Sequence, residues 1–423
     1  MLDIRLIREQ PDQVKTRLAT RGGDFSSMID DVLACDTERR KAETQLQELQ
    51  AERKRLSKEI GMLRSKGEDS TAIEAQVKSS ATEMERLQQE ANQLDLDQRE
   101  KLLYLPNLPQ AEVPVGKDAE DNPVLRTWGD KPQEKAFQED HVAIAARLKL
   151  FDLERAAKIS GSGFVCYTGQ GAKLERALIS FLLDLHTTEH GYTEISPPFL
   201  IRREAMIGTS QLPKFEEDMY ACPLDDLFLA PTAEVPITNL LREEILTLEE
   251  LPRKFVGYTP CFRREAGSTG RDNRGIIRMH QFDKVELVKV CAPENSCAEL
   301  ESLTAHAEVV LQRLGLHYRV IELCTGDMGF GSAKTYDIEV WSPGQKGYLE
   351  VSSCSNFEDY QARRMNLRFK GEDGKNRFCH TLNGSGTALA RLYVALIETG
   401  LQENGSILLP ECLHSYFGAK SIE

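Results

Sequence analysis

The chain has 423 residues, of which 40% are hydrophobic and 28% charged, a length and composition typical of a water-soluble protein with two domains. Its net charge of −14 excludes little, because binding a phosphate needs only a local basic surface. No apolar run approaches about 18 residues, and the first residues mix acidic with basic side chains, so we expect neither a membrane span nor a signal peptide. Ten cysteines without a C-x-x-C pair indicate reduced thiols in a cytoplasmic protein, with no disulfide frame and no zinc ribbon.

Residues 30–105 carry a heptad pattern in two halves, almost free of aromatic side chains. A breaker cluster at residues 66–70 separates the halves, with Ser70 as a candidate N-cap. Two long helices joined by so short a turn are expected to fold back as an antiparallel coiled-coil hairpin. The expected seam has one polar interruption, Arg53, and consists of Ala42, Leu46, Leu49, Arg53, Leu56, Ile60 and Leu63, followed by Ile73, Val77, Met84, Leu87, Ala91 and Leu94.

The two halves of this hairpin differ in charge. Residues 37–66 hold nine Lys or Arg against five Glu, a net of +4, whereas residues 71–105 hold four basic and seven acidic residues, a net of −3. The pattern alone leaves two interpretations open. The charges keep a coiled coil soluble, or the basic helix rests on a nucleic-acid backbone.

A Pro- and Asp-rich segment, residues 104–124, ends the helical pattern and is expected to be a linker. Beyond it, short strand-like runs alternate with helices, which predicts an antiparallel sheet with one face exposed to a ligand. The expected fold class is α+β, with a helical domain at residues 1–105, a linker at residues 106–124 and a second domain at residues 125–423.

The sequence contains no P-loop, dinucleotide fingerprint, G-x-S-x-G elbow or kinase signature, so any bound phosphate must be held by side chains. A hairpin across Gly267 to Gly275 would bring together alternate residues of two expected strands. They are Cys261, Arg263 and Glu265 on one strand, and Arg278, His280, Phe282, Lys284 and Glu286 on the other. An ordinary ladder of cross-strand ion pairs explains the charges, whereas an aromatic ring beside two guanidinium groups indicates a slot for a stacked base.

Five blocks resemble the motifs of class II aminoacyl-tRNA synthetases, in the form found in the seryl-tRNA synthetase family. HGYTEISPPFL resembles motif 1, FRREAGSTGRDNRGIIRMHQFDKVE motif 2 and NGSGTALARLYVALIE motif 3. FLAPTAEVP carries the Thr-Ala-Glu signature of the serine pocket, and YLEVSSCSNFEDYQARRMN matches the block before motif 3. The heptad hairpin matches the family's tRNA-binding arm, so the resemblance covers essentially the whole chain.

The resemblance implies an antiparallel sheet flanked by helices, a homodimer built partly through motif 1, and a cytoplasmic enzyme. Its reaction would join L-serine to ATP, giving seryl-adenylate and pyrophosphate, and then transfer serine to the 3′-terminal adenosine of tRNA(Ser). Whether tRNA(Sec) is also charged is left open. Three alternatives are disfavoured by the arm and the intact motifs: a relative that loads a carrier protein, a synthetase for another amino acid, and a non-catalytic paralogue.

Roles in ATP binding and catalysis follow from the resemblance. Arg263 matches the arginine that holds the α-phosphate and the serine carboxylate, and Glu265 the residue that reads the adenine amino group. Phe282 and Arg391 would cover the two faces of adenine. The implied ATP site is completed by Arg278, Met279, Glu350 and Ser353. Glu350 and Ser353 would hold Mg²⁺. The implied catalytic residues are Arg263, Glu350 and Arg391.

Serine selection is assigned by the same resemblance to Thr232, Glu234, Arg263, Glu286 and Ser385. The basic half of the hairpin is expected to contact tRNA through some of Arg39, Arg40, Arg53, Lys54 and Arg55. Within motif 2, Arg271 and Arg274 are expected to meet the tRNA acceptor end or only water. No Cys/His cluster has the composition of a zinc site, so no zinc is expected.

Overall fold

The computed structural model describes residues 1–266 and 274–423. Within them the chain divides into two compact units, one of residues 1–19 and 23–106 and the other of residues 20–22 and 107–423. Across the described residues, every helix is either too short or too polar to cross a membrane.

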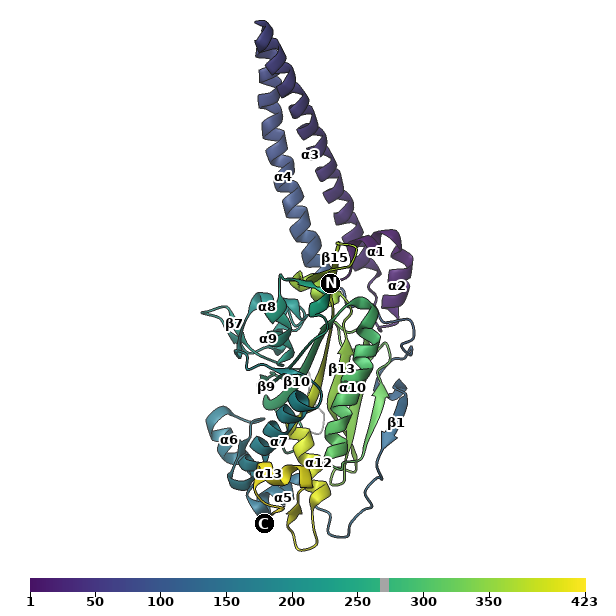
Figure 1. The fold of residues 1–423 in the computed structure, drawn as a ribbon, viewed down its shortest axis with the longest axis vertical. Coiled ribbons are helices and arrows are strands. Elements are labelled where there is room, and N and C mark those ends of the chain that lie inside the picture. The colour runs from purple at the N-terminus through teal and green to yellow at the C-terminus, as the bar shows by residue number, and fades with distance from the viewer. Residues whose placement is uncertain (267–273) are drawn as a thin grey trace. The chain divides into compact units, whose positions relative to one another are not determined.

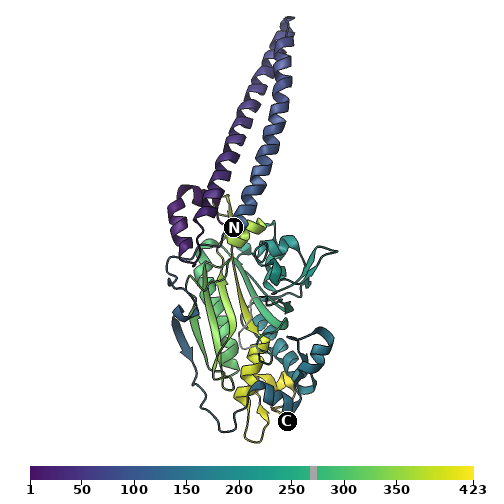
Figure 2. The ribbon, with the colours of Figure 1, turned by 180° about the vertical axis from the view of Figure 1, so that it is seen from behind.

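The first unit is a helical hairpin with two short helices before it, as Figures 1 and 2 show. Its elements are α1 (Ile4–Glu9), α2 (Pro11–Ala19), α3 (Ser26–Lys66) and α4 (Thr71–Leu103). The predicted antiparallel hairpin is confirmed, and the seam is buried at Ala42, Leu46, Leu56, Leu87 and Ala91. Arg53, the expected interruption, points to solvent.

The turn between the two long helices follows from its residues. Gly67 takes a left-handed conformation (φ 72°) that glycine adopts without strain, and it ends α3. Ser70 occupies the position before α4, as expected. Its hydroxyl donates to Glu74 instead of capping the helix backbone. The predicted position of the cap is therefore right, but its predicted contact is not made.

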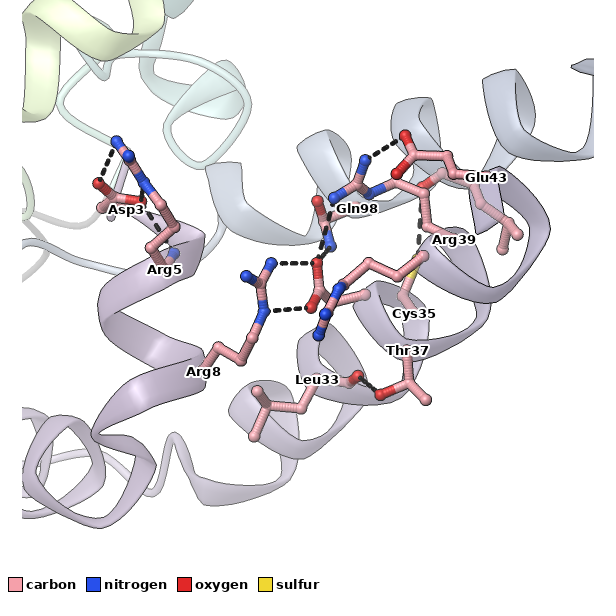
Figure 3. Close-up of polar contacts among 12 residues, drawn as sticks. Asp3, Arg5, Arg8, Leu33, Cys35, Thr37, Arg39, Glu43 and Gln98 are labelled. Carbon is pink, nitrogen blue, oxygen red and sulfur yellow. Dashed lines mark hydrogen bonds and ion pairs between the residues drawn. The ribbon is translucent and has the colours of Figure 1, made fainter. Parts of the chain in front are cut away.

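A buried carboxylate, Asp36, anchors the base of the hairpin. Arg8 donates to both of its oxygens (2.7 and 2.9 Å), and Gln98 (3.1 Å) and Arg39 (3.3 Å) complete the set. Figure 3 shows the side chains of Arg8, Gln98 and Arg39 gathered at the base of the hairpin. Burial acts to raise the pKa of Asp36, but the hydrogen bonds outweigh it and hold the pKa below its usual value. Asp36 therefore stays ionised and ties α1, α3 and α4 together.

The second unit is built on an eight-stranded sheet (Figure 1). Every neighbouring pair in it is antiparallel except β4 with β9. In spatial order its strands are β1 (Val124–Trp128), β11 (Tyr318–Glu322), β12 (Lys334–Ser342), β13 (Gly347–Asn356), β16 (His380–Ala388), β10 (Gln281–Cys291), β9 (Arg253–Phe262) and β4 (Thr193–Glu194). The predicted α+β class with an antiparallel sheet is confirmed.

Smaller sheets and nine helices complete this unit as the structure describes it. The smaller sheets are β5 (Leu200–Arg202), β7 (Leu227–Leu229) and β6 (Ala221–Cys222); β15 (Asn376–Phe378), β14 (Arg368–Lys370) and β8 (Ile245–Thr247); β17 (Ile407–Leu408) with β18 (Ser421–Ile422); and β2 (Phe151–Asp152) with β3 (Cys166–Tyr167). The helices are α5 (His141–Leu148), α6 (Leu153–Ser160), α7 (Gly169–Thr188), α8 (Arg203–Gly208), α9 (Glu234–Thr238), α10 (Ser296–Arg313), α11 (Tyr360–Met365), α12 (Leu389–Gly400) and α13 (His414–Phe417).

The main core lies where α7, α10 and α12 pack against the sheet. Val285 and Leu287 of β10 belong to this core and are fully buried. Because side chains alternate along a strand, the neighbouring Lys284 and Glu286 point to the opposite face. That face carries the candidate site.

The segment expected to be a linker is packed for part of its length. The side-chain amide of Asn107 donates to the carbonyls of Gly331 (3.0 Å) and Phe357 (2.9 Å). Val113 is buried in a small cluster with Ile321 and Leu323. Its proline-rich composition ends the helix as predicted, but these contacts hold residues 107–113 within the second unit.

Candidate active site

A pocket of about 450 Å³ opens on the second unit, between the α8–α9 region, the β9–β10 hairpin, β13, β16 and the start of α12. It is lined by every residue that the sequence analysis assigned to ATP, serine or Mg²⁺. They are Thr232, Glu234, Arg263, Glu265, Arg278, Met279, Phe282, Glu286, Glu350, Ser353, Ser385 and Arg391. These residues come from segments up to 159 positions apart in the chain, so only the fold brings them together.

The hairpin of β9 and β10 is shorter than the sequence pattern predicted. Phe262 pairs with Gln281 and Cys261 with Phe282, and the last backbone hydrogen bond runs from Arg263 N–H to His280 O (2.9 Å). Residues 264–266 and 274–279 lie outside the ladder, and residues 267–273, including Arg271, are not among the described residues.

Two members of the predicted strand face do not line the pocket. Cys261 is completely buried. The ring of His280 packs on Phe164, with 5.4 Å between ring centroids. By contrast, the guanidinium of Arg263 lies 5.3 Å from the ring centre of Phe282, so the predicted pairing of cation and aromatic ring is present.

One end of the pocket is built around Glu286, which is completely buried. One carboxylate oxygen accepts from the amide of Asn383 (2.8 Å) and the other from the hydroxyl of Thr232 (3.3 Å). Lys284 forms an ion pair with Glu286 and donates to the hydroxyl of Thr232 (2.8 Å). The carboxylate is thus held in one orientation by three neighbours, in a site nearly closed to water.

A second buried carboxyl group, Glu234, lies beside Glu286. Its Oε1 accepts from the amide of Gln361 (2.7 Å), and Gln361 in turn accepts from the hydroxyl of Thr381 (2.7 Å). Burial raises the pKa of Glu234 to about 7, and the charge of Glu286 adds to this effect. Glu234 therefore changes its protonation state close to neutral pH.

The other end of the pocket gathers arginines on fixed acceptors. Arg391 donates through Nε to Ile277 O (3.2 Å) and through Nη1 to the carbonyl (2.8 Å) and carboxylate (3.4 Å) of Glu350. Arg278 forms an ion pair with Glu265. Oriented guanidinium groups of this kind suit an anionic ligand such as a polyphosphate.

Glu350 and Ser353 offer oxygen donors of the type that Mg²⁺ prefers. Asp337 lies directly opposite Ser353 in the sheet, and its buried Oδ1 has no hydrogen-bond partner. Burial and the charge of Glu350 raise the pKa of Asp337 well above its usual value. The donor set fits a divalent cation. Within residues 1–266 and 274–423 no three His, Cys, Asp or Glu side chains could hold a metal alone, so further ligands must come from phosphates or water.

Sequence reasoning gave no role to four residues that shape this site. Strand periodicity could have predicted two of them. Lys284 was already placed on the face of Glu286, and Asn383, two residues before Ser385, lies on the same face as Ser385. Gln361 and Asp337 carried no such signal, because their partners are distant in the chain.

The remaining basic residues are placed as follows. Arg274 pairs with Asp140 at 3.0 Å. On the arm, Arg39 is held by Asp36 and Glu43, with 16% of its side chain exposed. The other four arm residues that the sequence analysis named are exposed, namely Arg40, Arg53, Lys54 and Arg55.

Comparison with protein families gives two matches. Residues 217–400 match the tRNA synthetase class II core domain (G, H, P, S and T), and residues 1–109 match the seryl-tRNA synthetase N-terminal domain. A serine–tRNA ligase of Akkermansia muciniphila is 60% identical over 422 residues, covering 100% of this chain and 99% of the relative. One from Geobacillus kaustophilus is 49% identical, covering 100% of both chains.

Solved structures of similar fold carry the same names. The seryl-tRNA synthetase of Pyrococcus horikoshii, complexed with ATP, superposes with a TM-score of 0.94 at 38% identity, covering 100% of this chain and 99% of the other. The cytoplasmic serine–tRNA ligase of Naegleria fowleri, in complex with AMP, gives a TM-score of 0.89 at 27% identity with the same coverage.

Proposed function

We propose that this chain, which belongs to the seryl-tRNA synthetase family, is a serine–tRNA ligase. It activates L-serine with ATP, releasing pyrophosphate, and transfers the serine from seryl-adenylate to the 3′-terminal adenosine of tRNA(Ser). The observation that carries the proposal is the buried carboxylate of Glu286, fixed by Thr232, Lys284 and Asn383 in the same pocket as the arginines.

Serine is selected at the closed end of the pocket. Glu286 accepts from the substrate hydroxyl in addition to its protein donors, and with alanine bound this further acceptor position stays without a donor, which is unfavourable in a buried site. Glu234 and Thr232 bind the substrate ammonium, and Ser385, on the strand paired with β10, closes the wall. Rejection of threonine has to come from lack of room for its extra methyl group, because a hydroxyl acceptor does not distinguish threonine from serine.

ATP occupies the arginine-lined end. The ring of Phe282 covers one face of adenine and Arg391 the other, while Glu265, with Arg278 beside it, accepts from the adenine amino group. The backbone at Met279 forms the neighbouring wall. These groups orient the α-phosphate toward the serine end of the pocket.

Arg263 lies between the two ends and acts on the reacting groups. Its guanidinium donates through Nε to Pro231 O (3.2 Å), and among the described residues its other donors have no acceptor, so they can bind both the serine carboxylate and the α-phosphate. Neutralising charge on both partners lowers the barrier to in-line attack of the carboxylate on phosphorus. Glu350 and Ser353 would hold Mg²⁺, which when bound neutralises phosphate charge.

The arm of α3 and α4 binds tRNA(Ser) by its shape and phosphates. We assign the contacts to Arg40, Arg53, Lys54 and Arg55, whose side chains are exposed. Arg39 forms ion pairs with Asp36 and Glu43, so we assign it to the structure of the arm and not to the tRNA contact.

We further propose a cytoplasmic homodimer assembled partly through the segment at residues 190–200. Phe199 and Leu200 of this segment are 38% and 50% exposed, which is apolar surface that a second copy would cover. Sedimentation analysis at micromolar concentration tests the dimer. Purified tRNA(Sec) in the charging assay decides whether that tRNA is a second substrate.

The direct test of the proposed function is amino-acid-dependent ATP–pyrophosphate exchange by the purified chain without tRNA. Exchange supported by serine, followed by transfer of labelled serine to tRNA(Ser), is the expected result. No exchange with serine and Mg-ATP would refute the proposal.

A further inference from the structure

A buried carboxylate–imidazole hydrogen bond outside the pocket connects α12 to the ATP site. Glu398, near the end of α12, and His141, the first residue of α5, are both completely buried. Glu398 Oε1 accepts from the His141 backbone N–H (2.9 Å) and lies 3.1 Å from its Nδ1. The other oxygen accepts from Gly344 N–H (3.0 Å) and from the hydroxyl of Ser342. Glu398 therefore has a full set of partners and fixes the imidazole ring.

The second ring nitrogen of His141 reaches the backbone that returns from motif 2. Its Nε2 accepts from Ile276 N–H at 3.4 Å. Gln345 Nε2 lies 3.4 Å from Nδ1, but the carboxylate of Glu398 is nearer and can only accept, so Nδ1–H donates to Glu398 and Nε2 is the acceptor. The preceding residue, Gly275, has φ 72°, and a Cβ there would lie 2.0 Å from Nε2. Only glycine allows the backbone to approach the ring this closely.

Ile277, which follows Ile276, is held by the N-terminal end of α12. Arg391, in the first turn of α12, donates to Ile277 O (3.2 Å). Helix α12 thus fixes residues 276–277 twice, directly through Arg391 and indirectly through Glu398 and His141. Arg278 and Met279, which follow at once, line the pocket.

We propose that His141, oriented by Glu398, is a positioning residue that holds the backbone of residues 276–279 in the conformation that binds ATP. The identity of the nucleotide rests on the proposed function. Without the acceptor at Nε2, Ile276 N–H has no hydrogen bond to His141, and the backbone that carries Arg278 and Met279 is held less firmly. The groups around Arg263 are left unchanged.

Two substitutions at one position separate the two bonds of the ring. In His141→Gln, the side-chain carbonyl lies near the position of Nε2 and accepts from Ile276 N–H. In His141→Asn, the shorter amide keeps only the bond to Glu398. We expect His141→Asn to raise the KM for ATP about tenfold with kcat changed less than about twofold, because a bond that aids ground-state binding is lost. His141→Gln is expected to restore the KM to within about threefold of the wild type.

His317→Asn is the matched control. This buried histidine also uses both ring nitrogens, bonding to Gly129 O (2.9 Å) and Tyr348 OH (2.9 Å), and neither bond is to residues 274–279. Its substitution should lower the unfolding temperature as His141→Asn does and leave the KM for ATP unchanged.

Calorimetric titration of each variant with ATP alone separates this inference from the proposed function. Weaker ATP binding in His141→Asn, recovered in His141→Gln, supports the inference even if serine fails to drive exchange in the wild type. Equal ATP affinity in the wild type and His141→Asn, with both histidine variants merely less stable, would overturn it.

Discussion

The hairpin of α3 and α4 exposes most of its charges to water, whereas the β9–β10 region encloses several of its own. Arg86, which pairs with Glu83 and Glu90 on α4, is 57% exposed in its side chain. In the pocket, Lys284 and Glu286 are only 7% and 1% exposed. Exposed pairs contribute about 0–1 kcal/mol, while breaking a buried pair costs about 3–5 kcal/mol. Substitution of an exposed charge on the arm should therefore have a small effect, and substitution of a buried charge a large one.

The largest effect is expected from Arg263→Ala. Removing the donor that we propose stabilises charge in the transition state should lower serine-dependent exchange by at least about 10³-fold. The unfolding temperature, followed by circular dichroism, should stay close to that of the wild type. Arg264→Ala is the matched control, because the neighbouring side chain is exposed, and it should retain exchange. Equal losses in the two variants would remove the special role of Arg263.

Asp36→Asn tests whether a buried charge in the arm behaves like those of the pocket. Losing the charge that Arg8 and Arg39 share should destabilise the first unit by about 3 kcal/mol, measured by urea unfolding. Exchange should be unaffected, since the pocket belongs to the second unit. Glu83→Gln, which breaks an exposed pair, should leave the urea midpoint almost unchanged. Similar losses for both would mean that burial does not set the difference.

Glu234→Gln tests whether the buried carboxyl group of the pocket makes the stability of the protein depend on pH. The pKa of Glu234 is raised from 4.5 to about 7, so the native state holds this proton more tightly than the unfolded chain does. The stability that results is complete below about pH 4.5 and is lost as the pH rises through about 7. Between pH 5 and 8 the wild type should lose on the order of 2 kcal/mol more than Glu234→Gln in denaturant unfolding. Parallel pH curves for the two proteins would contradict this assignment.

The smallest effect is expected on the arm surface. Arg53→Ala with Lys54→Ala should raise the KM for tRNA(Ser) by about threefold and reduce its salt dependence, because phosphate contacts are lost. Serine-dependent exchange without tRNA should not change. Lys78→Ala, an exposed residue on the more acidic helix, is the control and should leave the KM as it was. An effect confined to Lys78→Ala would place the tRNA on the other helix.

Local periodicity was enough to predict the hairpin, because its seam repeats within one helix at a time. Arg53 was predicted to interrupt the seam, and it points to solvent. The site residues were predicted from motifs whose spacing is local, and the fold places all of them around one pocket.

Contacts between distant segments could not be predicted. Asn383 holds Glu286 across 97 positions, and His141 meets Ile276 across 135. The strand pattern also predicted a longer β9–β10 ladder than the structure has. The pairing ends at Phe262 and Gln281, so the alternation of side chains does not extend to His280, and its ring packs on Phe164. Each of these depends on tertiary packing that no single window of sequence contains.

Selection of serine over alanine tests the role of the enclosed carboxylate most directly. The measurement is the ratio of kcat/KM for the two amino acids in ATP–pyrophosphate exchange, compared between the wild type and Glu286→Gln. We predict a ratio of about 10⁴ or more in the wild type, falling by at least about tenfold in the variant, because a site built to pair with a hydroxyl excludes a substrate that lacks one. An unchanged ratio would show that Glu286 does not read the hydroxyl and would contradict the account.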